Sequence, residues 1–173
     1  HFVINALVID PHNTNTVYAG TGGYGGGVYK TIDGGEHWTS INTGLPGNDV
    51  SALAIDFQNP YTLYAGTWGA SDARIWRSTD GWHWELAGSG WLTPTAYMYD
   101  AHVFQGQLYL GLGQPAQLWR TNGDGWEAVT TDGFGDSNNH SLNALMDFDG
   151  QTISFIFFLY SLRYSLEARY LSA

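Results

Sequence analysis

Short apolar runs alternate along this chain with turn-forming polar residues and glycine. The first run, residues 6–9 (ALVI), is followed by Asp and a turn, and the same order returns at residues 52–55 (ALAI). Looser copies begin at Ala101 and Ala144. Short apolar runs bounded by Gly, Pro, Asn and Asp predict β-strands rather than helices. The pattern therefore predicts an all-β chain in which one unit is repeated about every 45 residues.

Two further elements recur with the same period. A strand end of the type Tyr-Ala-Gly-Thr occurs at residues 18–21 and again at 64–67. Residues 27–38 (GVYKTIDGGEHW) return at 73–84 (ARIWRSTDGWHW) and, more weakly, at 117–126 (QLWRTNGDGW). Asp-Gly between two alternating runs predicts a hairpin, because the turn needs a positive φ angle. Each unit is therefore interpreted as four antiparallel strands, which is typical of a propeller blade.

The repeat predicts a β-propeller over residues 1–152 and a separate hydrophobic tail over residues 153–173. The predicted blades are residues 1–47, 48–91 and 92–136, with a partial fourth at 137–152. The tail contains no glycine and no Asp-Gly-Trp element, so we hypothesise that it is foreign to the repeat, through a frameshift or a fusion. Its apolar residues fit either a helical stripe or a buried strand. The apolar stretch is shorter than the ~20 residues that span a bilayer.

The composition of the chain limits the classes of partner it is expected to bind and the chemistry it can perform. The formal net charge of −10 disfavours nucleic acid and anionic membranes, and leaves neutral glycans, proteins or cations. The absence of cysteine excludes disulfides, thiolate metal sites and cysteine nucleophiles. The first residue is His rather than Met, so the chain is expected to be a processed or partial product. We expect an extracellular or periplasmic protein of bacterial type whose signal peptide is not present in this sequence.

One of the recurring segments has a recognisable form. Residues 31–38 (TIDGGEHW) resemble the Asp-box, or BNR repeat, whose pattern is Ser/Thr-x-Asp-x-Gly-x-Thr-Trp. Residues 78–84 (STDGWHW) look like the same box shortened by one residue, and residues 121–126 (TNGDGW) look like a degenerate copy. The chain is thus similar to the propellers of sialidases, xyloglucan-cleaving glycoside hydrolases and photosystem assembly factors. The resemblance implies a β-propeller and leaves the function open.

The resemblance also implies structural roles for the residues of each box. In these families the Asp side chain accepts hydrogen bonds from backbone N–H groups of its own turn, and the Trp packs between blades. The residues to which the resemblance gives a structural role are Thr31, Asp33, Gly35, Trp38, Ser78, Asp80, Gly81, Trp84 and Trp126.

Catalysis by a glycoside hydrolase would need two facing carboxylates, about 5 Å or about 6.5–9.5 Å apart. Asp10 and Asp56 recur at the same place in two repeats and are therefore interpreted as turn formers. Arg77 and Arg120 occupy the repeat position of Lys30, and the Phe/Tyr-Arg-Ile-Pro element of sialidases is absent. No residue is assigned as catalytic; if the chain is a hydrolase, the candidate acids are the less repetitive Asp49, Asp72 and Asp100.

A binding module is the more economical interpretation. In a propeller, the loops between the second and third strands and between successive blades lie on one face, and here they hold the residues that differ between repeats. Aromatic rings beside amides and carboxylates suit sugars, and the alternative for Trp68 and Trp91 is packing between blades. The candidate ligand-binding residues are Tyr24, Trp68, Asp72, Arg74, Trp91, Tyr97, Asn138 and His140.

The sequence therefore predicts a non-catalytic module that binds carbohydrate or a partner protein, with a glycoside hydrolase or an assembly scaffold as alternatives. No cofactor is expected; the oxygen-rich residues Asp132, Asp136 and Asn138 are a candidate calcium site, with a solvated turn as the alternative. Three and a half blades leave an open sheet edge, which favours a homo-oligomer that completes the propeller. A small four-bladed ring and an unstable fragment are the other outcomes.

Overall fold

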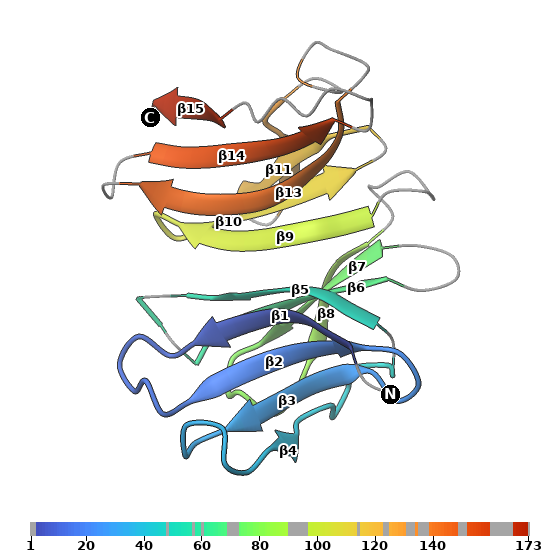
Figure 1. Ribbon diagram of the computed structural model, residues 1–173, viewed down its shortest axis with the longest axis vertical. Coiled ribbons are helices and arrows are strands. Elements are labelled where there is room, and N and C mark those ends of the chain that lie inside the picture. Colours follow the sequence, from blue (N-terminus) through green and yellow to red (C-terminus); the bar gives the residue numbers. More distant parts are fainter. Residues whose placement is uncertain are drawn as a thin grey trace. The chain divides into compact units, whose positions relative to one another are not determined.

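Strands form almost all of the regular structure in the computed structural model (Figure 1). The structure describes residues 3–47, 49–56, 58–59, 61–68, 73–89, 97–113, 115–122, 125–130, 134, 139–148, 152–159 and 168–172. Across these ranges no helix is long and apolar enough to cross a membrane. The chain divides into two compact units, His1–Pro94 and Thr95–Ala173.

The first unit contains two antiparallel sheets of four strands each. The first sheet is ordered β1 (Val3–Ile9), β2 (Val17–Gly22), β3 (Gly27–Thr31) and β4 (Thr39–Ser40). The second sheet is ordered β5 (Asp49–Ile55), β6 (Leu63–Trp68), β7 (Ala73–Ser78) and β8 (Glu85–Ser89). The register is the same in both, since Ala6 pairs with Gly20 and Ala52 with Gly66, each beside a β-bulge. The sequence repeat is thus also a structural repeat.

The two sheets share one hydrophobic core, because β5 packs against β1 and β2. The buried residues of this core are Tyr18, Val28, Ile41, Leu45, Val50, Leu53, Ile55, Leu63, Ala65, Trp76 and Trp84. Gly20 lies at a close approach between the sheets: a Cβ atom added there would lie 2.7 Å from Val50 Cγ1 and 3.2 Å from Leu53 Cγ. A methyl group therefore has no space at this position. The glycine of the Tyr-Ala-Gly-Thr element is what allows one sheet to contact the next.

The turns between the third and fourth strands have the conformation that their Asp-Gly pairs predict. Gly34 and Gly81 have φ angles of 73° and 72°, in the left-handed region. The tryptophans that follow these turns differ from each other. Trp84 is 5% exposed and its Nε1 donates to the Ile41 carbonyl of the first sheet (2.6 Å). Trp38 is 42% exposed and donates to Gly35 in its own turn (3.1 Å), contrary to the packing between blades that the resemblance implies.

The second unit is one antiparallel sheet of seven strands. These strands are β9 (Tyr97–Phe104), β10 (Gln107–Gly113), β11 (Gln117–Asn122), β12 (Gly125–Ala128), β13 (Asn139–Phe148), β14 (Thr152–Leu159) and β15 (Ala168–Ser172). β10 pairs with β9 and β11, and β13 joins β10 where Gly113 pairs with Ser141. The core of this unit contains Phe104, Tyr109, Ala116, Leu118, Leu142 and Leu145. The predicted third and fourth repeats thus belong to one sheet.

The register of β9 corrects the alignment of the third repeat by one residue. The sequence pattern placed Ala101 at the position of Ala6, whereas Asp100 is the residue that pairs with Gly111, as Ala6 pairs with Gly20. The cause is the β9–β10 turn. A tight turn with positive φ angles at Gln105 and Gly106 replaces the longer Asp-Pro turn of the first repeat.

The predicted hydrophobic tail contains two strands. Its first part was open between a helix and a strand, and the structure has the strand β14, which pairs antiparallel with β13 from Phe148↔Thr152 to Asn139↔Leu159. β15 then pairs with β14. The backbone hydrogen bonds of β14 and β15 therefore extend the sheet that contains β13. The boundary predicted after residue 152 and the foreign origin of the tail stay predictions.

Candidate binding surface

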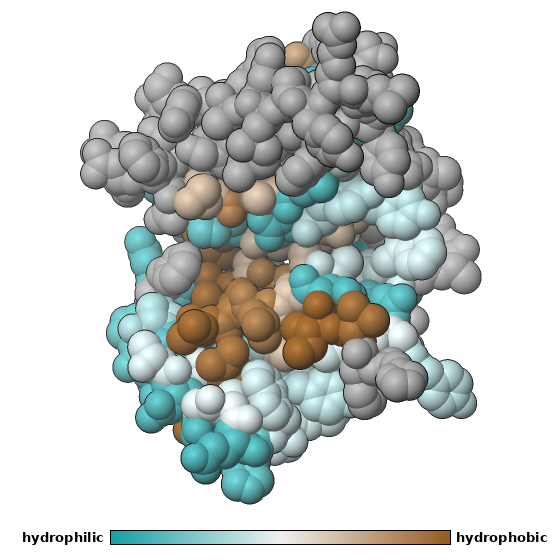
Figure 2. Space-filling view, viewed as in Figure 1, coloured by the Kyte–Doolittle hydropathy of each residue, from teal (hydrophilic) through white to brown (hydrophobic). Residues whose placement is uncertain are grey.

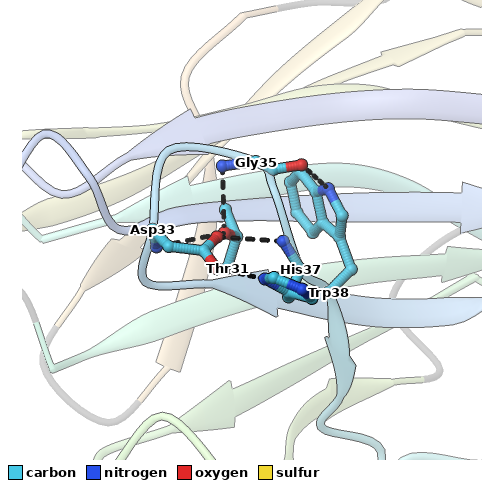
Figure 3. Close-up of polar contacts among 5 residues, drawn as sticks. All are labelled: Thr31, Asp33, Gly35, His37 and Trp38. Atoms are coloured by element: carbon cyan, nitrogen blue, oxygen red, sulfur yellow. Dashed lines mark hydrogen bonds and ion pairs between the residues drawn. The ribbon is translucent and has the colours of Figure 1, made fainter.

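The Asp-Gly turns at one end of the first unit are held by their own side chains (Figure 3). Asp33 Oδ1 accepts hydrogen bonds from the Thr31 hydroxyl (2.6 Å) and the His37 backbone N–H (3.0 Å), and Oδ2 lies 2.7 Å from His37 Nδ1. The Thr31 hydroxyl oxygen accepts the Gly35 N–H (3.0 Å). These contacts hold the pKa of Asp33 well below its usual range, and the hydrogen bond from the Thr31 hydroxyl has the largest effect.

The second turn repeats this arrangement. Asp80 Oδ1 accepts the N–H groups of Trp82 and His83, both at 2.8 Å, and Oδ2 lies 2.6 Å from His83 Nδ1. The Ser78 hydroxyl oxygen accepts the Gly81 N–H (3.0 Å). The pKa of Asp80 is likewise held well below its usual range, mainly by the backbone hydrogen bond from His83. Because the same contacts occur in both repeats, we interpret Asp33 and Asp80 as residues that stabilise their turns. In the degenerate third copy, Trp126 is half-buried and pairs with Thr121.

Asp80→Asn is expected to lower the midpoint of urea unfolding at pH 7. The folded-state pKa of Asp80 is depressed, so its carboxylate stabilises the fold above the unfolded pKa, and this contribution is lost as the pH falls through the folded value. The deficit of the variant should therefore shrink between pH 5 and pH 2, as measured by unfolding curves across that range. Glu85→Gln, which removes an exposed ion pair with Arg77, is the control and should change the midpoint little. A constant deficit at all pH values would contradict the expectation.

At the opposite end of the strands, a carboxylate connects the two sheets of the first unit. Asp49 begins β5 and pairs with Trp68 at the end of β6. Its Oδ1 accepts the backbone N–H of Gly23 (2.6 Å), in the β2–β3 loop of the first sheet. Arg74 follows on β7, where it pairs with Thr67 beside Trp68. The register and this hydrogen bond bring Asp49, Trp68 and Arg74 together at one end of the first unit, beside the loop that carries Tyr24.

Aromatic rings are open to solvent at this end. Tyr24 is 99% exposed and Trp68 is 39% exposed. Trp68 therefore does not have the fully buried environment of Trp84. Gly23 and Gly25, on either side of Tyr24, have positive φ angles of 94° and 86°, and the Gly26 N–H donates to the Gly23 carbonyl (3.0 Å), which makes the loop a tight turn. The loop thus presents an exposed aromatic ring one residue after the N–H that Asp49 binds.

The equivalent end of the second unit also gathers aromatic residues. Tyr97 pairs with Gly113, as Asp49 pairs with Trp68, so the two positions correspond. The rings of Tyr97 and Tyr99 are 6.2 Å apart and tilted by 44°. A Cβ atom on Gly113 would collide with the Tyr99 ring and lie 2.9 Å from the His140 carbonyl oxygen. The backbone of Gly113 thus lies between Tyr99 of β9 and His140 of β13, and Tyr97 pairs with the same glycine. Whether Tyr97 and His140 bind a ligand stays a prediction.

Asp100, a candidate acid, has a different environment. Oδ2 accepts the Leu145 N–H (2.6 Å) and Oδ1 accepts the Ala101 N–H (2.9 Å), so both oxygens bind the backbone. Burial raises the pKa of Asp100 to about 6, against the opposing effect of these two hydrogen bonds. Asp100 therefore joins β9 to β13 through the hydrogen bond from Leu145. Asp49 belongs to the other unit.

Several predicted residues lie outside the described residues. They are the candidate acid Asp72, the candidate ligand-binding residues Trp91 and Asn138, and the candidate calcium ligands Asp132 and Asp136. Among the described side chains, Asp33, Glu36 and His37 place ligand atoms within 4.8 Å of one another. All three are exposed, and Asp33 already binds His37, so this group serves the turn described above.

Sequence reasoning did not identify Gly23 and Asn5, which connect the sheets. Asn5 Nδ2 donates to the Val50 carbonyl of the second sheet (3.0 Å), as Gly23 donates to Asp49. A signal for Asn5 was present, because it is the polar residue that interrupts the apolar run of β1, at its bulge. Gly23 carries no such signal, since the loop around it contains glycine at several positions.

Comparison with known proteins identifies the class of fold. No family model matches the sequence, and no curated protein matches it. Among solved structures, an ancestral GH74 enzyme is similar over 98% of this chain and 25% of its own, with a TM-score of 0.66 and 14% identity. The nidogen/laminin complex is similar over 98% of this chain and 60% of the other, with a TM-score of 0.72 and 15% identity.

A third similar structure is YCF48 from Cyanidioschyzon merolae, with a TM-score of 0.62 and 14% identity over 96% of this chain and 56% of that one. At these identities the likeness defines the fold alone. The chain has an all-β, β-propeller-like fold, with two antiparallel four-stranded sheets and one sheet of seven strands. It spans about a quarter to three fifths of the length of these structures.

Proposed function

We propose that the protein is a non-catalytic binding module that recognises carbohydrate through the loop end that carries Tyr24, Asp49 and Trp68. The observation that supports this most directly is the exposure of two aromatic rings, from two different sheets, beside a carboxylate that connects those sheets. Aromatic faces stack on the C–H faces of sugar rings, while carboxylate and guanidinium groups bind hydroxyls. We place the protein outside the cell or in the periplasm.

A partner protein is the second ligand class, because tyrosine and tryptophan are also enriched at protein interfaces. Two of the similar structures are complexes of this kind: nidogen with laminin, and YCF48 bound to D1 peptide. A glycoside hydrolase receives less support from the described residues. Asp100 has both oxygens on backbone N–H groups, which leaves Asp49 without a described carboxylate partner in its own unit at this end.

Trp68→Ala is expected to weaken retention on the glycan that binds best in a broad panel by about tenfold or more, since truncation of a central aromatic contact costs at least about 1.4 kcal/mol. Tyr61→Ala is the matched control, because Tyr61 is also an exposed aromatic residue but precedes β6, at the opposite end of the strand from Trp68. It should leave retention unchanged. Retention and release of product are measured together on the purified chain.

Each result of this panel has a defined meaning. Retention without cleavage, lost in Trp68→Ala and kept in Tyr61→Ala, supports the proposal. Cleavage of any glycan would replace it with the hydrolase, and Asp49 and Asp72 would be the first residues to substitute. If no glycan is retained, carbohydrate recognition is wrong, and a partner protein or a scaffold role takes its place.

A further inference from the structure

One face of the first sheet is apolar and exposed, and we call its three residues the open face. They lie on β1 and are Ile4 (61% exposed), Leu7 (59%) and Ile9 (54%). Figure 2 shows apolar side chains gathered over this strand. Their register equivalents on β5 are all buried and are Val50 (0%), Leu53 (4%) and Ile55 (3%). The same positions of the same repeat are thus covered in one sheet and uncovered in the other.

The structure itself shows what covers such a face. Val50 and Leu53 of the second sheet lie against Gly20 of the first, where a side chain would not fit. The arrangement recurs in the second unit, where Leu142 of β13 lies against Gly111 of β10, and a Cβ atom on Gly111 would collide with it. In both cases, the cover is the second strand of the preceding repeat in the same unit, and glycine is the residue at the contact.

The tryptophan of the Asp-Gly turn supports the same conclusion independently. Trp84 is covered by Ile41 and Leu45 of the first sheet, with which it shares the core. Its equivalent, Trp38, lacks that burial, as described above. Strand β1 and the turn of the first sheet therefore leave exposed the residues whose equivalents in the second sheet are buried against the first sheet.

We propose that the open face is the docking surface for a further propeller blade, a four-stranded antiparallel sheet with glycine in its second strand. The incoming blade packs on Ile4 and Leu7 as the first sheet packs on Val50 and Leu53. The segment that follows its fourth strand covers Trp38 as Ile41 covers Trp84. The glycine requirement gives the surface its specificity, because any side chain at that point of the incoming strand would collide with the open face.

Among the described strands, none offers an available glycine at the position of Gly20. Gly20 and Gly111 already contact Val50 and Leu142, and Gly66 is itself buried. In the last repeat the register places Ile156 opposite Ala144, where Gly20 stands opposite Ala6. The last repeat therefore lacks the glycine, so a second copy of this chain does not supply the blade that the open face requires.

The absence of cysteine from the chain allows a direct test with a single thiol. Leu7→Cys places the thiol on the open face, and residues 1–46 are then duplicated ahead of His1 to supply a blade with glycine at the right position. The thiol is expected to react with Ellman's reagent at least about tenfold more slowly in the extended chain than in the chain of 173 residues. Leu53→Cys, at the buried equivalent position, provides the reference for a covered thiol.

The matched control is the same extended chain with Gly20→Val in the added copy alone. It should restore fast reaction of the thiol on the open face, because the valine blocks docking of the added blade while the original sheets are unchanged. Equal rates in the extended chain and in this control would overturn the proposal. It would also be overturned if the thiol of the unextended Leu7→Cys chain were protected at high protein concentration and reactive on dilution, since a second copy would then be the partner.

Discussion

Trp84→Ala is expected to lower the free energy of unfolding by about 3–5 kcal/mol, the range for removal of a large buried aromatic side chain. Two losses combine. The indole leaves a cavity between the first and second sheets, and the Ile41 carbonyl loses the hydrogen bond from Nε1. Urea unfolding followed by far-ultraviolet circular dichroism measures the change, since the remaining tryptophans complicate a fluorescence signal.

The matched substitution is Trp38→Ala, at the equivalent position of the first sheet. Because this indole is largely solvated and its hydrogen bond stays within its own turn, its removal should cost about 1 kcal/mol or less. The difference between the two variants tests the contact between the sheets. Equal losses in the two variants would show that the tryptophan acts within its turn in both repeats.

Asp100→Asn is expected to change the pH dependence of stability by up to about 3 kcal/mol, which corresponds to the rise in pKa from 3.8 to about 6. Since the folded-state pKa lies above the unfolded value, Asp100 favours folding below the unfolded pKa. This contribution is lost as the pH rises through about 6. Asparagine does not titrate, so its variant lacks this decline.

Unfolding curves of both proteins at pH 4, 5, 6 and 7 provide the measurement, with the difference between them as the quantity of interest. Wild type should lose stability relative to Asp100→Asn as the pH rises. Because asparagine also replaces one acceptor oxygen with an NH₂ group facing Leu145 N–H, a pH-independent offset is expected in addition. Parallel profiles would mean that Asp100 titrates near its ordinary pKa.

The repeat made most of the fold predictable from the sequence. The Asp-Gly turns and the Tyr-Ala-Gly-Thr strand ends located the strands of the first unit, because each carries a backbone requirement that few other residues meet. The register of β9 was not predictable, since its shorter turn left an apolar run that fits two alignments. The exposure of Trp38 could not be predicted from a repeat that treats both tryptophans as equivalent.

The candidate site was predictable only in part. Tyr24 and Trp68 were predicted because they differ between repeats, and the structure places Tyr24 in the β2–β3 loop and Trp68 at the end of β6. Their role in binding stays a prediction. The role of Asp100 was not found, because the misalignment of β9 concealed that it replaces the alanine of other repeats at Ala6 and Ala52. In the corrected alignment, Asp100 stands where two other repeats have alanine, and this difference is the signal that marks it.

The hydrogen bond from Gly23 to Asp49 has a consequence for how such a chain can change over evolutionary time. The loop that carries Tyr24 belongs to one repeat, and the carboxylate that anchors it belongs to the next. Gene duplication or loss copies and deletes whole repeats, so a duplicated repeat would carry the loop into a new place without its anchor. A change in the number of repeats would therefore also change which loops at this end of the strands are anchored.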